Sequence, residues 1–265
     1  MTESRGRHLR LYLHLLIGVI SILLCSCEST DDTSSNRSSS FSSGGVPASS
    51  GPDEMGHRPG PRGFRSVVID AGHGGKDSGA VSRRNGLTEK VLTMDVANRL
   101  KGELSGRFNV SMVRDSDSFV ELDERVNIAN RHPDAILVSI HFNESGRGIA
   151  GPETYYWRVD SYTLAKRVQR NLDELASQHN SRGLVRRRLH LTRNPVIPCI
   201  LVEGGYISNS SEAQALSSPG YRDKLARAIA KAIRDEAAEG DGDLGPLPPP
   251  INAPMSRPTD RRDRN

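Results

Sequence analysis

Residues 67–80 read VVIDAGHGGKDSGA, a short apolar run followed at once by a glycine-rich polar turn. The β-branched residues Val67, Val68 and Ile69 are typical of a buried strand in an α/β sheet. The glycines around His73 then let the backbone turn sharply and leave space beside the imidazole. The end of such a strand is where an α/β protein gathers functional side chains, so this stretch predicts both the fold class and a place to look for a site.

Helix-like and strand-like segments alternate along the chain after this turn. Apolar residues recur every four positions behind Thr88, from Leu92 to Leu104, and predict a helix with Thr88 as its N-cap. Similar patterns predict strands at 109–113, 135–140, 154–157, 189–191 and 200–202, and helices around 122–129, 164–175 and 221–233. The alternation predicts a single α/β domain with a mostly parallel twisted sheet and helices on both faces.

The two ends of the chain have a different composition. Residues 1–26 place three arginines ahead of an apolar run that ends near Leu24, as an export signal does. Residues 27–63 are rich in Ser, Gly and Pro and predict a disordered tether, and residues 240–265 predict a disordered Pro-rich tail. One folded domain is therefore expected at residues 64–239.

The export signal ends in Leu24-Cys25-Ser26-Cys27, which resembles the lipobox of bacterial lipoproteins. That resemblance implies cleavage before Cys27 and acylation of its sulfur. The alternative is an uncleaved signal anchor, although the apolar run is shorter than the roughly 20 residues of a spanning helix. Either version predicts a membrane-anchored protein on the outer side of the cytoplasmic membrane, or in the periplasm or outer membrane. Cys199, inside an apolar run, is expected to be a buried free thiol.

The charge balance gives no support for a nucleic-acid partner. The chain has 36 Lys and Arg against 32 Asp and Glu, and the first 26 residues hold three arginines and one acidic residue, so the remainder is close to neutral. Arg186, Arg187 and Arg188 form a local basic cluster. Such a cluster is either a solvated turn or a contact for acidic groups of an anionic substrate.

Four polar residues stand at the ends of apolar runs or at a helix start: His73, Glu89, His141 and Glu203. Each has an ordinary structural explanation, because histidines occur in cores, a first-turn glutamate suits the helix dipole, and a buried glutamate can pair with an arginine. Together they offer two imidazoles and a carboxylate for a hydrolytic zinc ion, with a second carboxylate left to act as general base.

Zinc suits amide hydrolysis because it lowers the pKa of a bound water to about 7 and stabilises the oxyanion. Glu203 is the candidate base, and Asp70 and Asn143 are candidates to orient the ligating histidines from behind. Asp70 has the alternative reading of a strand-end cap. The spacing of these residues fits no short local metal motif.

Several ordered blocks of this chain resemble the zinc-dependent N-acetylmuramoyl-L-alanine amidases of bacterial cell walls, the amidase type 3 family. The blocks are IDAGHGGKDSGA, GLTEKVLTMDVANRL, LDERVNIANRHPDAILVSIHFN, GPETYYW, the pair Arg182-Gly183 and PCILVEGGYISNSSEA. The resemblance covers about residues 67–233. It implies an α/β fold, zinc ligands at His73, Glu89 and His141, and a catalytic glutamate at Glu203.

The implied reaction is hydrolysis of the amide between N-acetylmuramic acid and the L-alanine of the stem peptide, which makes peptidoglycan the expected partner. Ala71 departs from the proline that many members carry. Some members also have an inserted helix that plugs the site, and the span 143–198 is too short for one, so no obligatory activator is expected. The alternatives are a catalytically dead peptidoglycan-binding lipoprotein and a zinc amidohydrolase that acts on another exported amide.

Overall fold

The computed structural model describes residues 63–146, 148–176 and 181–242. In chain order the elements are β1 (Ser66–Ala71), α1 (Glu89–Leu104), β2 (Asn109–Met112), α2 (Leu122–Asn130), β3 (Ala135–Asn143), β4 (Glu153–Tyr156), η1 (Val159–Ser161), α3 (Tyr162–Leu175), β5 (Gly183–Arg186), α4 (His190–Arg193), β6 (Cys199–Tyr206), α5 (Ser210–Ser217) and α6 (Pro219–Glu239). The predicted signal, Cys27 and nearly all of the tether and tail lie outside the described residues. Within them, no helix has both the length and the apolar character needed to cross a membrane.

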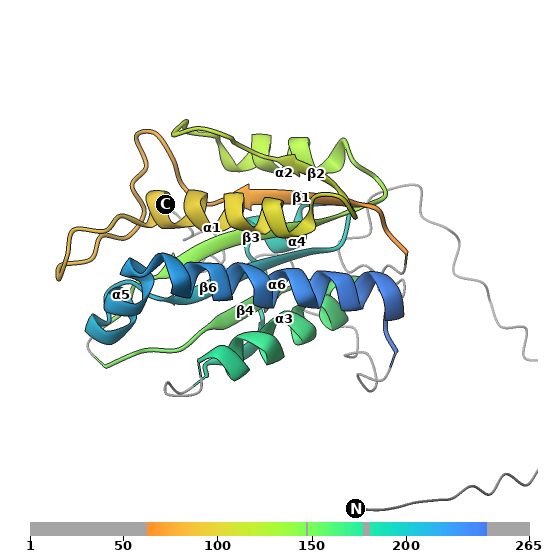
Figure 1. Cartoon of the computed structure of the whole chain (residues 1–265). Helices are drawn as coiled ribbons and strands as arrows, with labels where there is room; N and C mark the ends of the chain where they lie inside the picture. Colours follow the sequence, from red (N-terminus) through yellow and green to blue (C-terminus); the bar gives the residue numbers. More distant parts are fainter. Residues whose placement is uncertain (1–62, 147, 177–180, 243–265) are drawn as a thin grey trace, which may run out of the picture. The chain divides into compact units, whose positions relative to one another are not determined.

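The strands form one six-stranded sheet in the order β2-β1-β3-β6-β4-β5 (Figure 1). The first four strands run parallel to one another, and β4 and β5 are parallel to each other. β4 pairs with β6 in the antiparallel direction. The predicted α/β fold, with a mostly parallel sheet flanked by helices, is therefore confirmed, with one antiparallel seam that the sequence pattern did not indicate.

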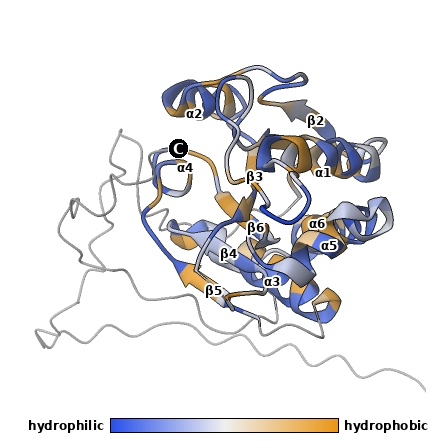
Figure 2. Ribbon diagram, turned by 90° about the vertical axis from the view of Figure 1, so that its left-hand side faces the viewer, coloured by the Kyte–Doolittle hydropathy of each residue, from blue (hydrophilic) through white to orange (hydrophobic). Residues whose placement is uncertain are grey.

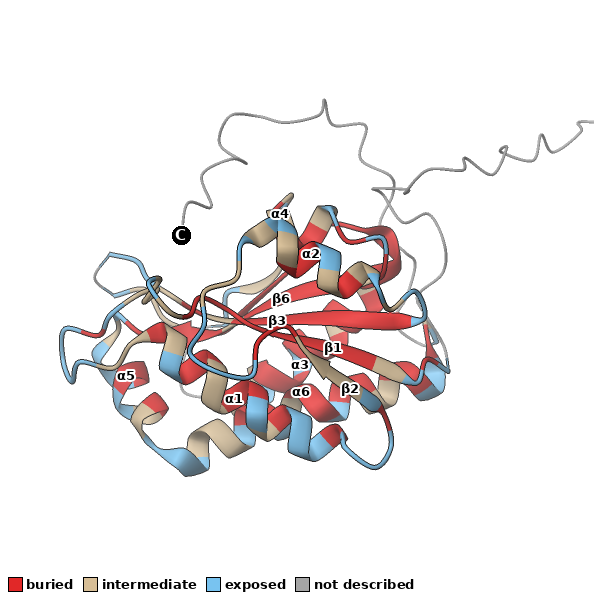
Figure 3. Ribbon diagram, turned by 90° about the horizontal axis from the view of Figure 1, so that it is seen from above, coloured by how far each residue is buried: buried red, intermediate tan, exposed pale blue. Residues whose placement is uncertain are grey.

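Helices cover both faces of the sheet. Helices α1, α3 and α6 lie on one face, and α2 and α4 lie on the other (Figures 2 and 3). Successive side chains of β1 point to opposite faces of the sheet. Val67 and Ile69 pack in the larger core, whereas Val68 packs in the smaller core beneath α2. Asp70 lies on the α2 face with Val68, and this is the face on which the site forms.

The structure differs from the sequence prediction at residues 183–193 and 210–217. The strand expected at 189–191 is wrong: β5 lies earlier, at Gly183–Arg186, and residues 190–193 form α4. The Thr192 hydroxyl accepts the Leu189 N–H at 3.0 Å and donates to the carbonyl oxygen of Arg187 at 2.8 Å, which stabilises a helical turn there. Helix α5 was not predicted, although Asn209 caps it by accepting from the N–H groups of Ser211 and Glu212.

Candidate metal and catalytic site

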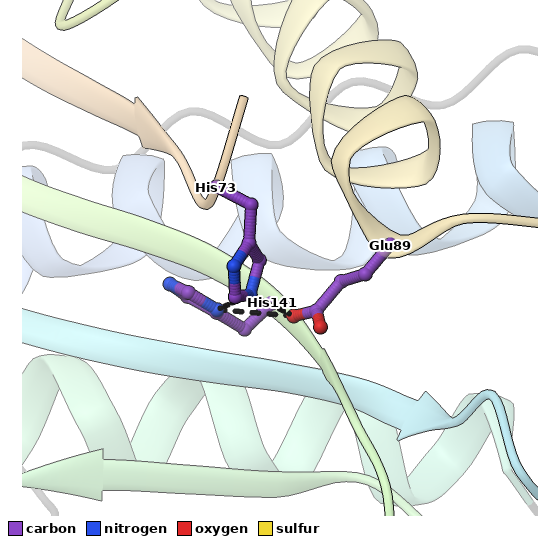
Figure 4. A group of neighbouring side chains, drawn as sticks. All are labelled: His73, Glu89 and His141. Carbon is purple, nitrogen blue, oxygen red and sulfur yellow. Dashed lines mark hydrogen bonds and ion pairs between the residues drawn. The ribbon is translucent and has the colours of Figure 1, made fainter. Parts of the chain in front are cut away.

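Three predicted ligands come together from separate parts of the sheet edge. His73 lies in the turn after β1, Glu89 is the first residue of α1, and His141 lies near the end of β3 (Figure 4). His73 Nε2 lies 2.9 Å from Glu89 Oε1, His141 Nδ1 lies 3.0 Å from the same oxygen, and the two nitrogens are 3.2 Å apart. The three donor atoms therefore form a compact triangle.

The glycine-rich turn makes this approach possible. A Cβ at Gly72 would lie 2.3 Å from Cε1 of His141, and a Cβ at Gly79 would lie 2.6 Å from Oε2 of Glu89. His73 itself has φ +60°, a conformation that non-glycine residues seldom adopt. The backbone at positions 72 and 79 lies so close to the ligand side chains that any side chain larger than that of glycine would collide with them.

Two buried arginines hold the turn in place. Arg114 donates to the carbonyl oxygens of Ala71 and Gly72 at 2.8 and 2.9 Å. Arg125 donates to the carbonyl oxygen of His73 at 2.8 Å and to Asp70 Oδ1 at 2.6 Å. The carbonyl oxygens of this turn thus accept hydrogen bonds from two guanidinium groups. These bonds hold the turn in one conformation although it has no regular secondary structure.

Two of the ligands, His73 and Glu89, are oriented by further hydrogen bonds. Asp77 Oδ2 lies 2.8 Å from His73 Nδ1, which directs Nε2 of that ring toward Glu89. The Glu89 carboxylate accepts the N–H of Phe142 at 2.9 Å on Oε1 and that of Ala80 at 2.9 Å on Oε2. A carboxylate behind a ligating histidine is a common device for fixing the tautomer of a metal ligand.

The electrostatics of the triad favour an ionised Glu89. Burial alone would raise the pKa of Glu89, but the hydrogen bonds and charges of His141 and His73 hold it well below its usual range. Burial lowers the pKa of His73, and Glu89 and Asp77 outweigh that effect, so the pKa is raised overall. The ionised carboxylate of Glu89 therefore lies between the two imidazoles. A divalent cation bound to the three side chains would be stabilised by this negative charge.

The donor set and its spacing fit zinc. A tetrahedral zinc ion with bonds of about 2.0–2.1 Å holds its ligand atoms about 3.3–3.4 Å apart. The observed separations of 2.9 to 3.2 Å are slightly smaller, and small side-chain movements would open the triangle by that amount. Two imidazoles and one carboxylate leave a fourth position open, as a hydrolytic site requires.

Glu203 lies beside the triad. It is the Cα partner of His141 across the β3–β6 ladder, and its side chain therefore projects from the same face of the sheet. A cavity of about 460 Å³ is lined by His73, His141 and Glu203 together with residues of the segments 119–123 and 187–191. The structure thus places the predicted base and two of the predicted ligands on one cavity.

Neither of the two residues predicted to orient the histidines bonds to a histidine ring. The Asp70 carboxylate bonds to Arg125 and, at 2.6 Å, to the Ser139 hydroxyl, so it acts on the turn through Arg125 and not on a ring. Asn143 lines the cavity but donates to Tyr206 Oη at 3.3 Å. The residue that does contact a histidine ring is Asp77. Its position in the polar turn, four residues after His73, is the sequence feature that could have indicated this contact.

The arginines of the basic cluster lie against different aromatic rings. The guanidinium of Arg186 lies 5.4 Å from the ring centroid of Trp157, and that of Arg188 lies 6.0 Å from it. Arg187 instead lies 5.8 Å from the ring centroid of Tyr155 and lines the cavity. Of the three arginines predicted as a contact for an anionic substrate, only Arg187 lies on the lining of this cavity.

Sequence reasoning did not single out Glu153, a buried carboxylate opposite Glu203 across the antiparallel seam. It accepts hydrogen bonds from the hydroxyls of Tyr155 at 2.7 Å and Tyr206 at 3.2 Å. Burial and then Glu153 raise the pKa of Tyr155, and the same two causes contribute to raising that of Tyr206 to about 12. Only the pairing of β4 with β6 shows that Glu153 and Glu203 are neighbours. The sequence around Glu153 alone therefore could not have identified it as a residue near the site.

Cys199 is fully buried and is a free thiol, as predicted. Burial raises its pKa, and its Sγ lies 3.2 Å from the carbonyl oxygen of Thr192. The residue packs with Val68 and Leu137 in the smaller core. It is a core side chain, away from the cavity lining.

Comparison with known proteins agrees with this geometry. The sequence profile of the N-acetylmuramoyl-L-alanine amidase family Amidase_3 matches residues 67–235. The uncharacterized protein YqiI of Bacillus subtilis is 37% identical over 174 residues, which cover 64% of this chain and 83% of that protein. The amidase LytC of the same organism is 36% identical over 171 residues, and this chain spans 34% of its length.

Solved structures give the same result. The N-acetylmuramoyl-L-alanine amidase AmiC2 of Nostoc punctiforme superposes with a TM-score of 0.62 at 36% identity, over 66% of this chain and 97% of that one. The catalytic domain of CwlV, from Bacillus (Paenibacillus) polymyxa var. colistinus, also gives 0.62, at 34% identity over 65% and 97%. By sequence and by fold, the chain belongs to the N-acetylmuramoyl-L-alanine amidase family of peptidoglycan hydrolases.

Proposed function

We propose that this amidase is zinc-dependent, that His73, Glu89 and His141 hold the metal, and that Glu203 is its general base. The bond cleaved is the amide between N-acetylmuramic acid and the L-alanine of the stem peptide. The observation that carries the proposal is the triangle of donor atoms, 2.9 to 3.2 Å on each side, whose two histidines line the same cavity as Glu203.

The residues divide the chemistry between them. When bound, zinc supplies Lewis-acid stabilisation of the oxyanion and a water of lowered pKa. Glu203 accepts the proton of the attacking water and delivers it to the leaving nitrogen of L-alanine, a contribution of about 100- to 10,000-fold in rate. Asp77 keeps Nε2 of His73 available as a ligand by holding the proton on Nδ1.

The cavity supports a site that works without an activator. The described part of the span between Asn143 and Pro198 is occupied by β4, η1, α3, β5 and α4, which belong to the sheet and its layers. The cavity of about 460 Å³ beside the triad can admit a stem peptide. We therefore expect the purified domain to cleave peptidoglycan with no second protein added.

The setting that we propose is outside the cytoplasm, where peptidoglycan lies. The basic and apolar residues 1–26 and the Leu24-Cys25-Ser26-Cys27 sequence favour export and lipid anchoring at Cys27, in the service of wall remodelling or cell separation. Radiolabelled fatty acid that enters the wild type but not a Cys27→Ala variant supports the lipid anchor. Equal labelling of both proteins overturns it.

The activity is tested by incubating the purified protein with peptidoglycan and measuring new L-alanine amino termini. We expect these termini to appear, to be lost on chelation and to return when zinc is restored. Binding to peptidoglycan with no product, zinc included, indicates the catalytically dead alternative. Absence of both binding and product, together with cleavage of a different amide, indicates an amidohydrolase of other specificity.

A further inference from the structure

Arg187 differs from the other basic side chains on the catalytic cavity. Arg125 is buried and paired with Asp70, and His190 Nε2 lies 2.9 Å from Asp123. Arg187 is exposed and makes no ion pair within the ranges that the structure describes; its guanidinium lies over the ring of Tyr155. The cavity therefore presents one arginine whose charge no carboxylate of the described chain neutralises.

The local backbone explains why this arginine is the one that faces the cavity. Residues 187–189 connect β5 to α4, and the chain turns at Arg188, where the N–H of Leu189 donates to the carbonyl oxygen of Arg187 at 3.0 Å. Arg186 and Arg188 lie against Trp157, whereas Arg187 lies above Tyr155. The position of Arg187 is fixed further because its N–H donates to the carbonyl oxygen of Tyr156 at 2.8 Å.

The surroundings of Arg187 favour an anion at its guanidinium and disfavour one at the segment 119–123. Leu189 and Leu201 pack with Tyr155 beneath it and form an apolar floor. The segment 119–123 carries the exposed carboxylates Glu121 and Asp123, which also line the cavity, and Asp123 lies 2.9 Å from His190 Nε2. An anionic ligand is repelled from that segment and attracted to Arg187, whose planar guanidinium matches a carboxylate in two parallel hydrogen bonds.

We propose that Arg187 binds a free carboxylate of the stem peptide and thereby selects non-amidated stem peptides over amidated ones. This inference rests on the proposed function, because it assumes that the stem peptide occupies the cavity between the triad and the 187–191 segment. The second and third residues of a stem peptide each carry a carboxylate that is free in some peptidoglycans and amidated in others. Both are candidates, and the chemistry that Arg187 recognises is the same.

Three synthetic muropeptides test the proposal: one with both carboxylates free, one amidated at the second residue and one amidated at the third. For the wild type we expect amidation at one of these positions to lower kcat/KM by about 10- to 100-fold, the range expected for a charged hydrogen-bond pair. Arg187→Gln should cleave all three at similar, low rates, and Arg187→Lys should recover part of the preference. The position at which amidation matters identifies the carboxylate.

Arg188→Gln is the matched control, because it removes the same charge from the neighbouring residue of the same segment. We expect this variant to keep the wild-type ratio between free and amidated substrates, with melting temperatures confirming that both variants fold. A wild type that does not discriminate, or an Arg187→Gln variant that discriminates as the wild type does, overturns the proposal.

Calorimetric titration with the free stem tripeptide separates this inference from the proposed function. We expect the acid form to bind the zinc-loaded wild type about 10- to 100-fold more tightly than it binds Arg187→Gln. If the wild type binds the tripeptide through Arg187 but cleaves no muropeptide, the proposed function fails and the inference stands. If it cleaves muropeptides while both proteins bind the tripeptide equally, the inference fails and the function stands.

Discussion

The two parts of the sheet contribute differently to the site. The parallel strands β2, β1, β3 and β6 and their connections supply the three predicted ligands and Glu203. The β4–β5 pair, joined by the antiparallel seam, supplies Glu153, Tyr155 and, just beyond β5, Arg187. In the proposed function, the parallel part holds the metal, whereas the β4–β5 part receives the substrate.

The largest effect is expected from His141→Ala in the parallel part. Loss of this imidazole removes a donor from the triangle, and the zinc with it. Because the metal contributes several kcal/mol to transition-state stabilisation, activity should fall by at least about 1,000-fold. Zinc content by atomic absorption and release of L-alanine termini are measured together. The matched change in the β4–β5 part, Tyr155→Phe, should keep its zinc; a zinc-free Tyr155→Phe would break the comparison.

A steric change at Gly72 comes next. The added methyl group of Gly72→Ala would lie 2.3 Å from the His141 ring, so the ring must move away from the other two donors. A misplacement of about 1 Å at a reacting centre costs about 100-fold in rate. Gly102→Ala is the control, since the helix α1 has open space there. Equal activity of both variants would show that the close approach at Gly72 has no functional importance.

Asp77→Asn tests the support behind the metal ligands. The change weakens the hydrogen bond that orients His73, and we expect zinc affinity to fall by about 10- to 100-fold. Competition with a chromophoric chelator measures this affinity. Asp115→Asn, a change of the same charge at an exposed position, should leave it unaltered. Unchanged affinity in Asp77→Asn would remove Asp77 from the site.

Asp77→Asn is also expected to shift the pH dependence of zinc affinity. In the zinc-free protein the pKa of His73 is raised, so the protonated ring stabilises the fold at low pH and that stabilisation is lost as pH rises through the raised pKa. Zinc needs the neutral ring, so its affinity must fall as pH drops through the same value. Asp77→Asn should move this fall to lower pH. A profile that does not move would contradict the assigned cause.

The smallest effect on the metal is expected from Glu153→Gln. Two tyrosine hydroxyls donate to this carboxylate, and loss of its charge should lower the free energy of unfolding by about 1–3 kcal/mol. The pKa of Tyr206 should fall from about 12 toward its ordinary value, as an ultraviolet titration can show. Zinc affinity should stay at the wild-type value. A loss of zinc here would mean that the two parts of the sheet are not separate in function.

The residues that could be predicted from the sequence are those fixed by short-range signals. Val67 to Ile69 and the glycines around His73 form a strand and a sharp turn whatever the remainder of the chain does. His141 and Glu203 follow short apolar runs, which are typical of buried strands. The local sequence around each of these residues therefore indicates that it lies at the end of a strand. In a parallel α/β sheet the carboxyl ends of the strands lie at the same edge, so these residues are expected to lie near one another.

The residues that could not be predicted depend on pairing between distant segments. Glu153 is informative only because β4 turns antiparallel to β6 and sets it opposite Glu203. The direction in which Arg187 points depends on where β5 ends, and the leucines at 189 and 191 suggested a strand where α4 forms. The partner of Asp70 was missed likewise, because Arg125 lies 55 residues away in the sequence.

The division of roles at the metal is tested most directly by measuring zinc content and kcat on the same preparation of Glu203→Gln. The account predicts a full complement of zinc, an unchanged melting temperature and a kcat lower by about 100- to 10,000-fold, because only proton transfer is lost. Zinc lost together with activity would make Glu203 a ligand, and wild-type kcat would show that another group is the base. Either result would contradict the central claim.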